Sequence, residues 1–274
     1  MNQGVSVIVP NYNLSKFLPE AIESIVAQTY RPLEIVVVDD CSTDESPDIL
    51  RAYEQKDWGE GVTFHAVLLP KNGMVSHARN VGAENASYDY ICFMDSDDRF
   101  YNPKKIENEM NLVMKYAEKG EDIVAYSRIV YMDYDGNVFG NQGTNPKRYM
   151  EGDVKYYLIS GFKAARLPRD YVFKKSIFFD VKGYPEGFYE DFDILLKLSF
   201  KCRFFCTQEW GTVYRRFPDG LSHKPYKEHL KVRRGMCRKY FKTLKPAQKL
   251  KCSFYFCLRA MRNFVRILKG EKVR

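Results

Sequence analysis

Long apolar runs are missing from this sequence of 274 residues. Stretches such as Leu33 to Val38 and Val67 to Leu69 fall far short of the ~20 residues that a membrane-spanning helix needs. The N-terminus enters a strand pattern by Val5, without the charged segment and apolar core of a signal peptide. We therefore expect a cytoplasmic protein without a transmembrane helix.

Cysteine and histidine are too few and too irregularly spaced for a disulfide framework or a zinc site. Only four histidines occur, and no two cysteines form a CxxC pair. The cysteines are an odd set of seven, at Cys41, Cys92, Cys202, Cys206, Cys237, Cys252 and Cys257. We expect reduced thiols, most of them buried. A GxGxxG motif is also absent, which disfavours a dinucleotide-dependent dehydrogenase.

Acidic residues are scarce only at the C-terminal end of the chain. Residues 227–274 hold 16 Lys and Arg but two acids, a local charge of +14, whereas residues 1–226 carry −6. The overall charge of +8 is therefore a property of the tail. Such asymmetry indicates that the tail meets an anionic surface, either a membrane or a nucleic acid.

The chain is 45% hydrophobic and 15% aromatic, which is enough to bury the core of one large domain, or of one domain with a smaller appendage. Strand and helix patterns alternate through its first half. We predict strands at 5–10, 33–38, 62–69, 88–94 and 122–132, and helices at 15–28, 44–55, 76–86 and near 103–119. Ser15 is the expected cap of the first helix, and Pro19 fits its first turn. The alternation predicts an α/β fold whose mostly parallel, Rossmann-like sheet carries helices on both faces.

The second half of the chain is less regular. An Asp-Gly pair within 133–140 predicts a hairpin, and 141–170 has no strong periodicity. A helix is expected at 190–200, followed by two closing strands at 203–210 and 211–217. We predict a domain over residues 1–225, with halves of about 1–132 and 133–225, and a basic amphipathic helical tail over 226–274.

Polar clusters follow the predicted strands at the points where the strands end. They are Pro10 to Asn13, the pair Asp39 and Asp40, Pro70 to Gly73 including Asn72, and Asp95 to Asp98. Ligands of open α/β sheets bind beyond the carboxyl ends of parallel strands. We therefore expect all four clusters at one edge of the sheet.

The fourth cluster is four residues long and holds three carboxylates, at Asp95, Asp97 and Asp98. They would repel one another unless a cation sat among them, and their oxygens suit Mg²⁺ or Mn²⁺. The alternative is a solvated acidic turn. The cation interpretation implies a substrate phosphate that completes the metal's coordination shell.

Six segments follow one another along about residues 4–223: SVIVPNYN, IVVVDDCSTDES, KNGMVSHARNVG, ICFMDSDD, EGFYEDFDILLKL and YRRFPDGLS. In order and spacing they resemble glycosyltransferase family 2, a family of nucleotide-sugar transferases with the GT-A fold. The resemblance implies a catalytic domain over 1–225, with a nucleotide-sugar half and an acceptor half. It also implies a hexosyltransferase activity that depends on Mn²⁺ or Mg²⁺.

The resemblance implies a donor site at the strand ends. Pro10 and Tyr12 would line the nucleobase pocket, and Asp40 with Asp39 would accept hydrogen bonds from uracil and ribose. The alternative is that the two acids cap the next helix, although Ser42 and Asp44 could do so instead. Asn72 and Arg79 complete the predicted donor set, Arg79 approaching the diphosphate or the neighbouring acids.

The resemblance also implies the reactive groups. Asp95 and Asp97 match the family's Asp-x-Asp motif, with Asp97 the preferred metal ligand and Asp98 close to the ribose or the metal. Asp191 matches the general base, and helix-start acidity is the alternative for this position. The implied reaction is a single in-line displacement that inverts the anomeric carbon. The donor is then a nucleotide-diphosphate sugar, UDP by analogy, and the acceptor a hydroxyl of a glycan or lipid-linked sugar, as in cell-surface polysaccharide synthesis.

One segment departs from the family pattern. Phe217 stands where the family often has a histidine, and His223 is a candidate substitute. Arg215 and Arg216 are predicted to contact the diphosphate.

The tail segment 250–270 mixes apolar and cationic residues at helical spacing. It suits an interfacial helix on anionic lipid at the inner face of the membrane, and the alternative is a helix packed on the domain. No nucleic-acid module accompanies the charge, so we expect no nucleic-acid partner. Two rival functions stay open: a non-catalytic nucleotide-sugar or membrane binder on the same scaffold, and a sugar nucleotidyltransferase. The second is disfavoured because no Gly-rich basic loop follows the first strand.

Overall fold

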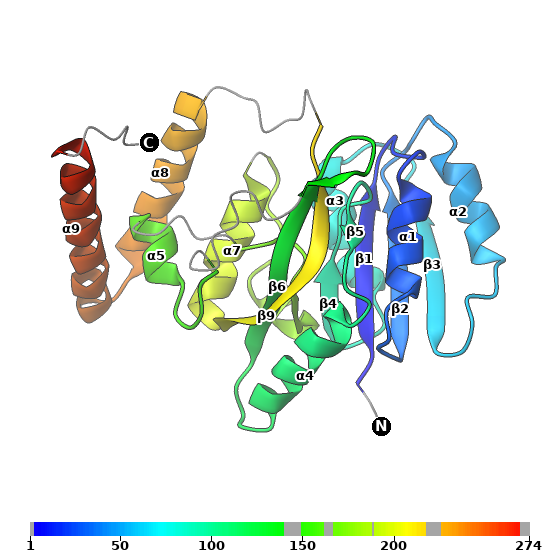
Figure 1. Ribbon diagram of the computed structural model, residues 1–274, viewed down its shortest axis with the longest axis horizontal. Coiled ribbons are helices and arrows are strands. Elements are labelled where there is room, and N and C mark those ends of the chain that lie inside the picture. Colours follow the sequence, from blue (N-terminus) through cyan, green and yellow to red (C-terminus); the bar gives the residue numbers. More distant parts are fainter. Residues whose placement is uncertain (1–2, 140–148, 162–166, 188, 218–225, 269–274) are drawn as a thin grey trace.

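A nine-stranded sheet forms the centre of the molecule, with helices on both faces (Figure 1). The computed structural model describes residues 3–139, 149–161, 167–187, 189–217 and 226–268. In this part of the chain the strand order is β3-β2-β1-β4-β8-β6-β9-β5, and β7 pairs with β6.

The longer strands all run in the same direction. They are β1 (Val5–Asn11), β2 (Leu33–Asp39), β3 (Val62–Leu68), β4 (Tyr90–Phe93), β6 (Ile123–Met132) and β9 (Arg203–Arg215). The antiparallel strands have two or three residues each: β5 (Arg99–Phe100), β7 (Val138–Phe139) and β8 (Val172–Lys174). The prediction of a mostly parallel α/β sheet is therefore confirmed.

The valine run of β2 is explained by burial on both faces. Ile35 and Val37 point into one core and Val36 and Val38 into the other, because successive strand side chains alternate. The first core is covered by α1 (Leu18–Val26), α2 (Ser46–Glu54) and α4 (Lys105–Ala117). The second core is covered by α3 (Met74–Asn85), α5 (Lys155–Ser160), α6 (Lys175–Asp180) and α7 (Glu190–Lys201).

The start of the first helix was predicted wrongly. Helix α1 begins at Leu18 and has no side-chain cap, whereas Pro19 lies in its first turn as expected. Ser15 instead donates two long-range hydrogen bonds: its N–H donates to Asp44 over 2.8 Å, and its hydroxyl donates to Glu45 over 2.9 Å. A residue that joins two loops is therefore unavailable as a cap.

The closing part of the sheet also differs from the prediction. Residues 203–215 form one strand, β9, where two were expected, and the register with β6 shifts near Arg128. Gln208 has a φ of 66°, so a local irregularity bends the strand without ending it. The short elements β5, β8, α5 and α6 were not predicted, because two to six residues carry too little periodicity. The predicted hairpin is confirmed by the pairing of Met132 with Val138.

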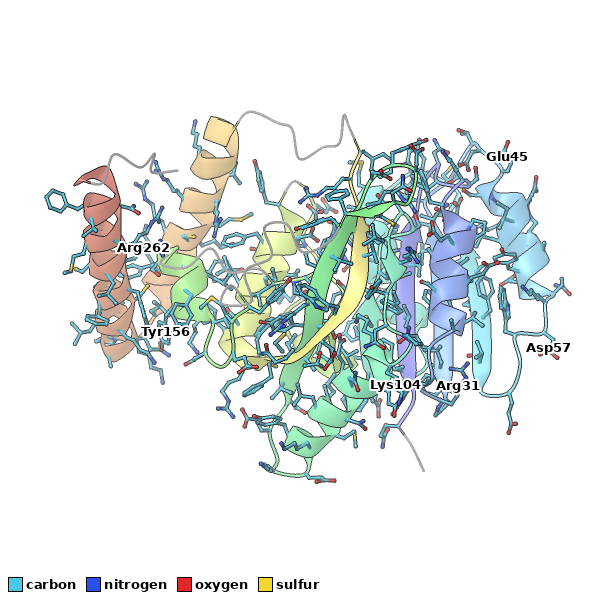
Figure 2. The ribbon with its side chains drawn as sticks, viewed as in Figure 1. Arg31, Glu45, Asp57, Lys104, Tyr156 and Arg262 are labelled. Carbon is cyan, nitrogen blue, oxygen red and sulfur yellow. The ribbon has the colours of Figure 1, made fainter. Side chains whose placement is uncertain are left out.

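The C-terminal extension is helical, as predicted, but it consists of two helices. They are α8 (Tyr226–Thr243) and α9 (Pro246–Leu268), and both pack against α5 at one end of the molecule (Figure 1). Tyr156 of α5, labelled in Figure 2, lies against α9, where the Lys251 Nζ is 4.6 Å from the centre of its ring. All seven cysteines are free, and four of them are buried, as expected.

Candidate functional site

The predicted convergence of polar clusters is present at one edge of the sheet. β1 pairs in parallel with both β2 and β4, so their carboxyl ends lie side by side. Asn11 and Asp39 are register partners at the ends of β1 and β2. The Asn11 side-chain amide donates to the Asp39 carboxylate over 2.8 Å.

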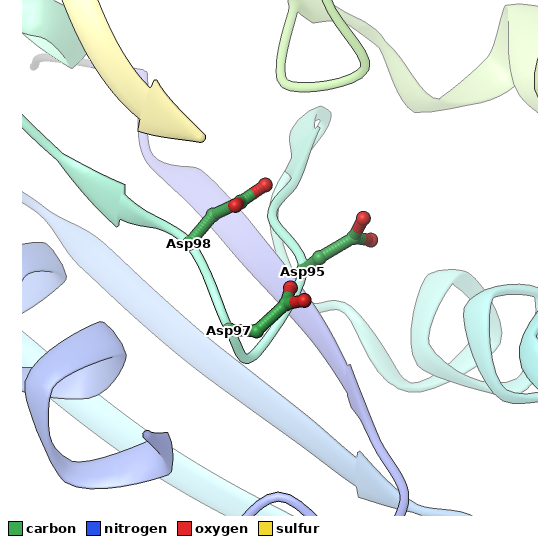
Figure 3. Close-up of side chains that lie close together, drawn as sticks. All are labelled: Asp95, Asp97 and Asp98. Carbon is green, nitrogen blue, oxygen red and sulfur yellow. The ribbon is translucent and has the colours of Figure 1, made fainter. Parts of the chain in front are cut away.

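The acidic loop after β4 brings three carboxylates together. Oxygens of Asp95, Asp97 and Asp98 lie within 4.8 Å of one another, and Figure 3 shows the three side chains grouped on this loop. Burial, together with the charge of Asp95, raises the pKa of Asp97 to about 6. Burial and the charge of Asp97 raise the pKa of Asp98 as well. The loop therefore holds more negative charge than it can stabilise alone.

Arg79 joins this loop to the predicted base. Its guanidinium is buried and donates to Asp95 over 2.8 Å and to Asp191 over 3.0 Å. Its Cζ also lies 4.9 Å from the centre of the Tyr184 ring. Burial alone would lower the pKa of Arg79, but the Asp95 and Asp191 carboxylates raise it above its ordinary value. Of the two roles predicted for Arg79, the contact with neighbouring acids is the one present in this structure.

Arg169 is a second guanidinium in the site, and sequence reasoning missed it. Its Nη1 lies 2.8 Å from Asp95 and 3.9 Å from Asp191, and its Nη2 lies 3.2 Å from Asp98. Burial alone would raise the pKa of Asp95. The positive charges of Arg169 and Arg79 outweigh burial and lower the pKa to about 2. No pattern in 141–170 marked this residue, since a single arginine beside a loop has no periodicity.

A buried polar network holds the backbone beside Arg169. Asp170 accepts hydrogen bonds from Thr212 and, over 2.5 Å, from Tyr214, whose hydroxyl oxygen in turn accepts the Arg169 N–H over 2.7 Å. Asp170 is also bonded through its backbone: the fully buried Lys105 Nζ donates to the Asp170 carbonyl over 2.8 Å. The same Nζ contacts the Glu109 carboxylate at 2.9 Å. The network therefore fixes the segment from which Arg169 reaches the acidic loop.

Asp191 lies in the first turn of α7, where free backbone N–H groups favour an anion. Its side chain is 33% exposed, against 17% for Asp95 and 3% for Asp98, so it is the most accessible of these three acids. Burial and the charge of Asp191 raise the pKa of the neighbouring Glu190. Asp191 therefore combines access to a substrate with a position beside the metal-ligand candidates.

Helix α8 of the tail supports the same turn of α7. The Tyr240 hydroxyl donates to Asp193 over 2.9 Å, and the Arg233 Cζ lies 4.7 Å from the centre of the Phe192 ring. These contacts fall on the two residues that follow Asp191. The tail thus helps to set the position of the predicted base.

The predicted nucleobase residues line the ends of β1 and β2 with different exposures. Tyr12 is 46% exposed and Pro10 is buried, so only the tyrosine presents an open face. Asp39 accepts from Asn11 and also from the backbone N–H and hydroxyl of Ser42, which closes the following turn. Asp40 accepts the Gly73 N–H over 2.7 Å at the start of α3.

Asn72 is exposed beside this turn and accepts the N–H of Met74 over 3.1 Å. Asp44 accepts the N–H of Ser46, the first residue of α2, so the helix start is bonded without Asp40. Binding of a nucleotide by Tyr12, Asp40 and Asn72 stays a prediction.

Arg215 is held inside the protein. Its guanidinium donates to the Glu20 carboxylate over 2.5 Å, to the Asp97 carbonyl over 2.9 Å and to the Tyr134 carbonyl over 2.9 Å. Its backbone N–H donates to Asp98 over 2.8 Å. These bonds tie β9 to the acidic loop, and a contact with diphosphate stays a prediction.

The position with phenylalanine in place of the family's histidine belongs to an aromatic cluster. The Phe217 ring lies 5.6 Å from both Phe17 and Tyr134, in edge-on arrangements. Arg216 is exposed, with its Cζ 4.2 Å from the centre of the Tyr131 ring. His223 lies outside the described residues.

The acidic loop fits a hard divalent cation. Its donors are carboxylate oxygens, which Mg²⁺ and Mn²⁺ prefer. In the described part of the chain Asp97 has no ion pair, so no arginine or lysine of these residues competes with a metal for its carboxylate. Asp95 and Asp98 are both paired with Arg169, whose side chain is 36% exposed and therefore free to withdraw more easily than the buried Arg79.

The Arg169→Gln variant tests this competition between guanidinium and metal. In EDTA we expect it to unfold about 1–2 kcal/mol more easily, because Asp95 and Asp98 lose a countercharge; the side chain's partial exposure reduces the effect below that of a buried pair. Added Mn²⁺ should stabilise the variant more than the wild type. Thermal unfolding with EDTA and with Mn²⁺ measures both effects.

Arg203→Gln is the matched control, since Arg203 pairs with Glu121 at the surface, away from this loop. Its response to Mn²⁺ should equal that of the wild type. Equal Mn²⁺ stabilisation of Arg169→Gln and wild type would contradict a competition between Arg169 and the metal.

Two bacterial glycosyltransferases are similar to this chain in sequence. TuaG of Bacillus subtilis, assigned to teichuronic acid biosynthesis, is 37% identical over 111 residues, which cover 40% of this chain and 42% of TuaG. GlyG of Streptococcus pneumoniae is 37% identical over 140 residues, which cover 51% of this chain and 44% of GlyG. The chain therefore spans less than half the length of each of these relatives.

Solved structures share the fold at low sequence identity. S. aureus TarS 1-349 in complex with UDP-GlcNAc has a TM-score of 0.68 and 19% identity, over 93% of this chain and 72% of that one. The mannosyltransferase PcManGT from Pyrobaculum calidifontis, in complex with GDP-Man and Mn²⁺, has a TM-score of 0.57 and 17% identity, over 98% and 76%. These likenesses support the GT-A type of α/β fold.

The family model of glycosyl transferase family 2 matches residues 6–169, more than half of the chain. The match covers the first four of the six segments, all of them in the predicted donor half, and extends to Arg169. It confirms the family expected from the sequence. The chain belongs to glycosyl transferase family 2.

Proposed function

We propose that this protein is a metal-dependent, inverting glycosyltransferase that moves a sugar from a nucleotide-diphosphate donor to an acceptor hydroxyl. The single observation that supports it most is Arg79, which binds Asp95 and Asp191 with one guanidinium. A predicted metal ligand and a predicted base, 96 residues apart in sequence, are thereby neighbours in one site. That juxtaposition is what a displacement at an anomeric carbon requires.

The proposed reaction is one in-line step. Asp191 accepts the proton of the acceptor hydroxyl, the acceptor oxygen forms a bond to the anomeric carbon, and the bond from that carbon to the diphosphate oxygen breaks. The electron pair leaves with the nucleoside diphosphate. A bound Mn²⁺ or Mg²⁺ would supply positive charge for the leaving diphosphate, and Asp97, with Asp95, would hold it. A single displacement inverts the anomeric configuration.

The finer substrate assignment rests on similarity. TarS is described in complex with UDP-GlcNAc and with UDP, and PcManGT with GDP-Man and Mn²⁺. TuaG is assigned to teichuronic acid biosynthesis. We infer a UDP-sugar donor and a glycan or lipid-linked acceptor, as in cell-surface polysaccharide synthesis.

A purely binding protein on the same scaffold is the main rival. Such a protein would need the donor residues but no accessible acid beside them, and Asp191 is one-third exposed in that position. A sugar nucleotidyltransferase would release pyrophosphate or consume a sugar phosphate. Product analysis separates the three functions.

A screen of nucleotide sugars tests the proposal. We expect slow hydrolysis of one UDP-sugar in the presence of Mn²⁺, with UDP and free sugar as products, and no hydrolysis in EDTA. GDP-mannose is the matched comparison for the choice of nucleotide. Failure of every UDP- and GDP-sugar to turn over, with Mn²⁺ and with added glycan acceptors, would overturn the assignment.

A further inference from the structure

One side of helix α9 is attached to the domain. Cys252 is fully buried, and the Tyr255 hydroxyl lies 3.2 Å from that of Tyr157 on α5. Arg259 donates to the Ser160 carbonyl over 3.0 Å, at the end of α5. The alternative of a packed helix is therefore correct for this side.

The opposite side of α9 is an exposed apolar stripe. At 100° per residue it consists of Leu250, Phe254, Cys257, Met261 and Phe264, spaced alternately by four and three residues. Four of these residues have large exposed fractions: 75% for Leu250, 59% for Phe254, 65% for Met261 and 61% for Phe264. In Figure 2, α9 stands at one end of the molecule, and side chains extend from it away from the other elements. A continuous exposed apolar surface of this kind marks an interaction site.

Basic residues accompany this outer stripe of α9. No acidic residue occurs between Lys231 and Val265. On α8 the exposed Lys231, Arg234, Arg238 and Lys242 recur at intervals of three and four, so they share one side of that helix. α8 and α9 both contact α5 (Figure 1), and the ring centres of Phe241 on α8 and Phe256 on α9 lie 6.1 Å apart. The tail thus combines an apolar stripe with a positively charged one.

Two occupants could cover the outer stripe: a lipid bilayer or a second copy of the chain. The four-and-three spacing would suit a coiled coil, but two copies would bring tails of equal positive charge together without acids to pair them. An anionic bilayer matches both the apolar stripe and the charge. Among the described residues no helix is long and apolar enough to cross a membrane, so α9 would lie in the plane of the interface.

We propose that α9 binds an anionic lipid surface, with its outer stripe among the acyl chains and the basic side of α8 against the headgroups. This inference goes beyond the proposed function and does not rest on it. Because α8 contacts the two residues that follow Asp191, a membrane-bound tail would connect the lipid surface directly to helix α7.

Vesicle flotation of the full chain tests the proposal. We expect binding to phosphatidylcholine vesicles that contain phosphatidylglycerol, weaker binding at high salt, and little binding to phosphatidylcholine alone. The double variant Phe254→Ser with Phe264→Ser should lose about tenfold in binding, and so should Arg234→Glu with Arg238→Glu. Phe179→Ser is the matched control, because Phe179 is 46% exposed on α6, outside the tail, and its loss should leave binding unchanged.

Two further measurements keep the outcome clear. Thermal unfolding should match the wild type for the Phe254/Phe264 variant, since both side chains are exposed, and hydrolysis of a soluble donor reports on the proposed activity independently of lipid. Equal flotation of this variant and the wild type would overturn the proposal. The proposal would also be overturned if the wild type bound no lipid and had the mass of a dimer, and if the Phe254/Phe264 variant had the mass of a single chain. That result would favour a second copy of the chain as the occupant of the outer stripe.

Discussion

Asp191→Asn is expected to lower kcat by at least about 10³-fold while donor affinity stays unchanged, because a general base acts in the chemical step. The amide keeps the size of the carboxylate and can still contact Arg79, but it cannot accept the acceptor's proton. The ion pairs of Asp191 among the described residues are with Arg79 and Arg169, which are not residues of the predicted nucleobase pocket. Transfer kinetics together with donor titration by calorimetry measure the two effects separately.

Asp193→Asn is the matched control for this prediction. Asp193 lies in the same helical turn but contacts Tyr240 and Lys197 instead of Arg79. Its substitution should reduce stability more than turnover. If Asp193→Asn abolished transfer and Asp191→Asn did not, the base would be misassigned; if Asp191→Asn lost donor binding as well, Asp191 would be a binding residue.

Much of the fold was predictable because its strongest features are periodic. The valines of β2 alternate between two cores, and a strand buried on both faces belongs to a parallel sheet covered by helices. The edge that holds Asp39 and Asp95 follows from this geometry, because parallel strands present their carboxyl ends on one side. The parallel direction of the strands is therefore enough to predict the edge of the sheet at which the site lies.

The contacts within the site were less predictable. Neither Arg169 nor Arg215 shows its partner in the sequence, and only the three-dimensional path of the chain brings Arg169 to Asp95 and Arg215 to Glu20. β8 inserts between β4 and β6 with three residues, too short to show a period. The sequence also could not reveal that α9 buries one side and exposes the other, because both sides carry apolar residues.

The acidic loop gives the second large expected effect, for Asp97→Asn. In EDTA this variant should be at least as stable as the wild type, because it removes one of three neighbouring negative charges and breaks no ion pair of the described residues. The raised pKa of Asp97, about 6, has the same cause: burial and the adjacent Asp95 both oppose its ionisation. Gained or unchanged stability would show that Asp97 is not there to hold the fold.

The same substitution should nevertheless weaken Mn²⁺ binding at least tenfold and lower the rate of sugar transfer by about 10³-fold. The reason is that the Asp97 carboxylate, which destabilises the metal-free loop, is also the expected metal ligand. Mn²⁺-dependent thermal shifts and steady-state transfer are the measurements. Asp98→Asn provides the contrast: Asp98 accepts the Arg215 N–H and pairs with Arg169, so its loss should destabilise the protein in EDTA. Unaltered Mn²⁺ affinity in Asp97→Asn would contradict a metal site on this loop, because Asp97 is the one of these three carboxylates that has no ion pair among the described residues.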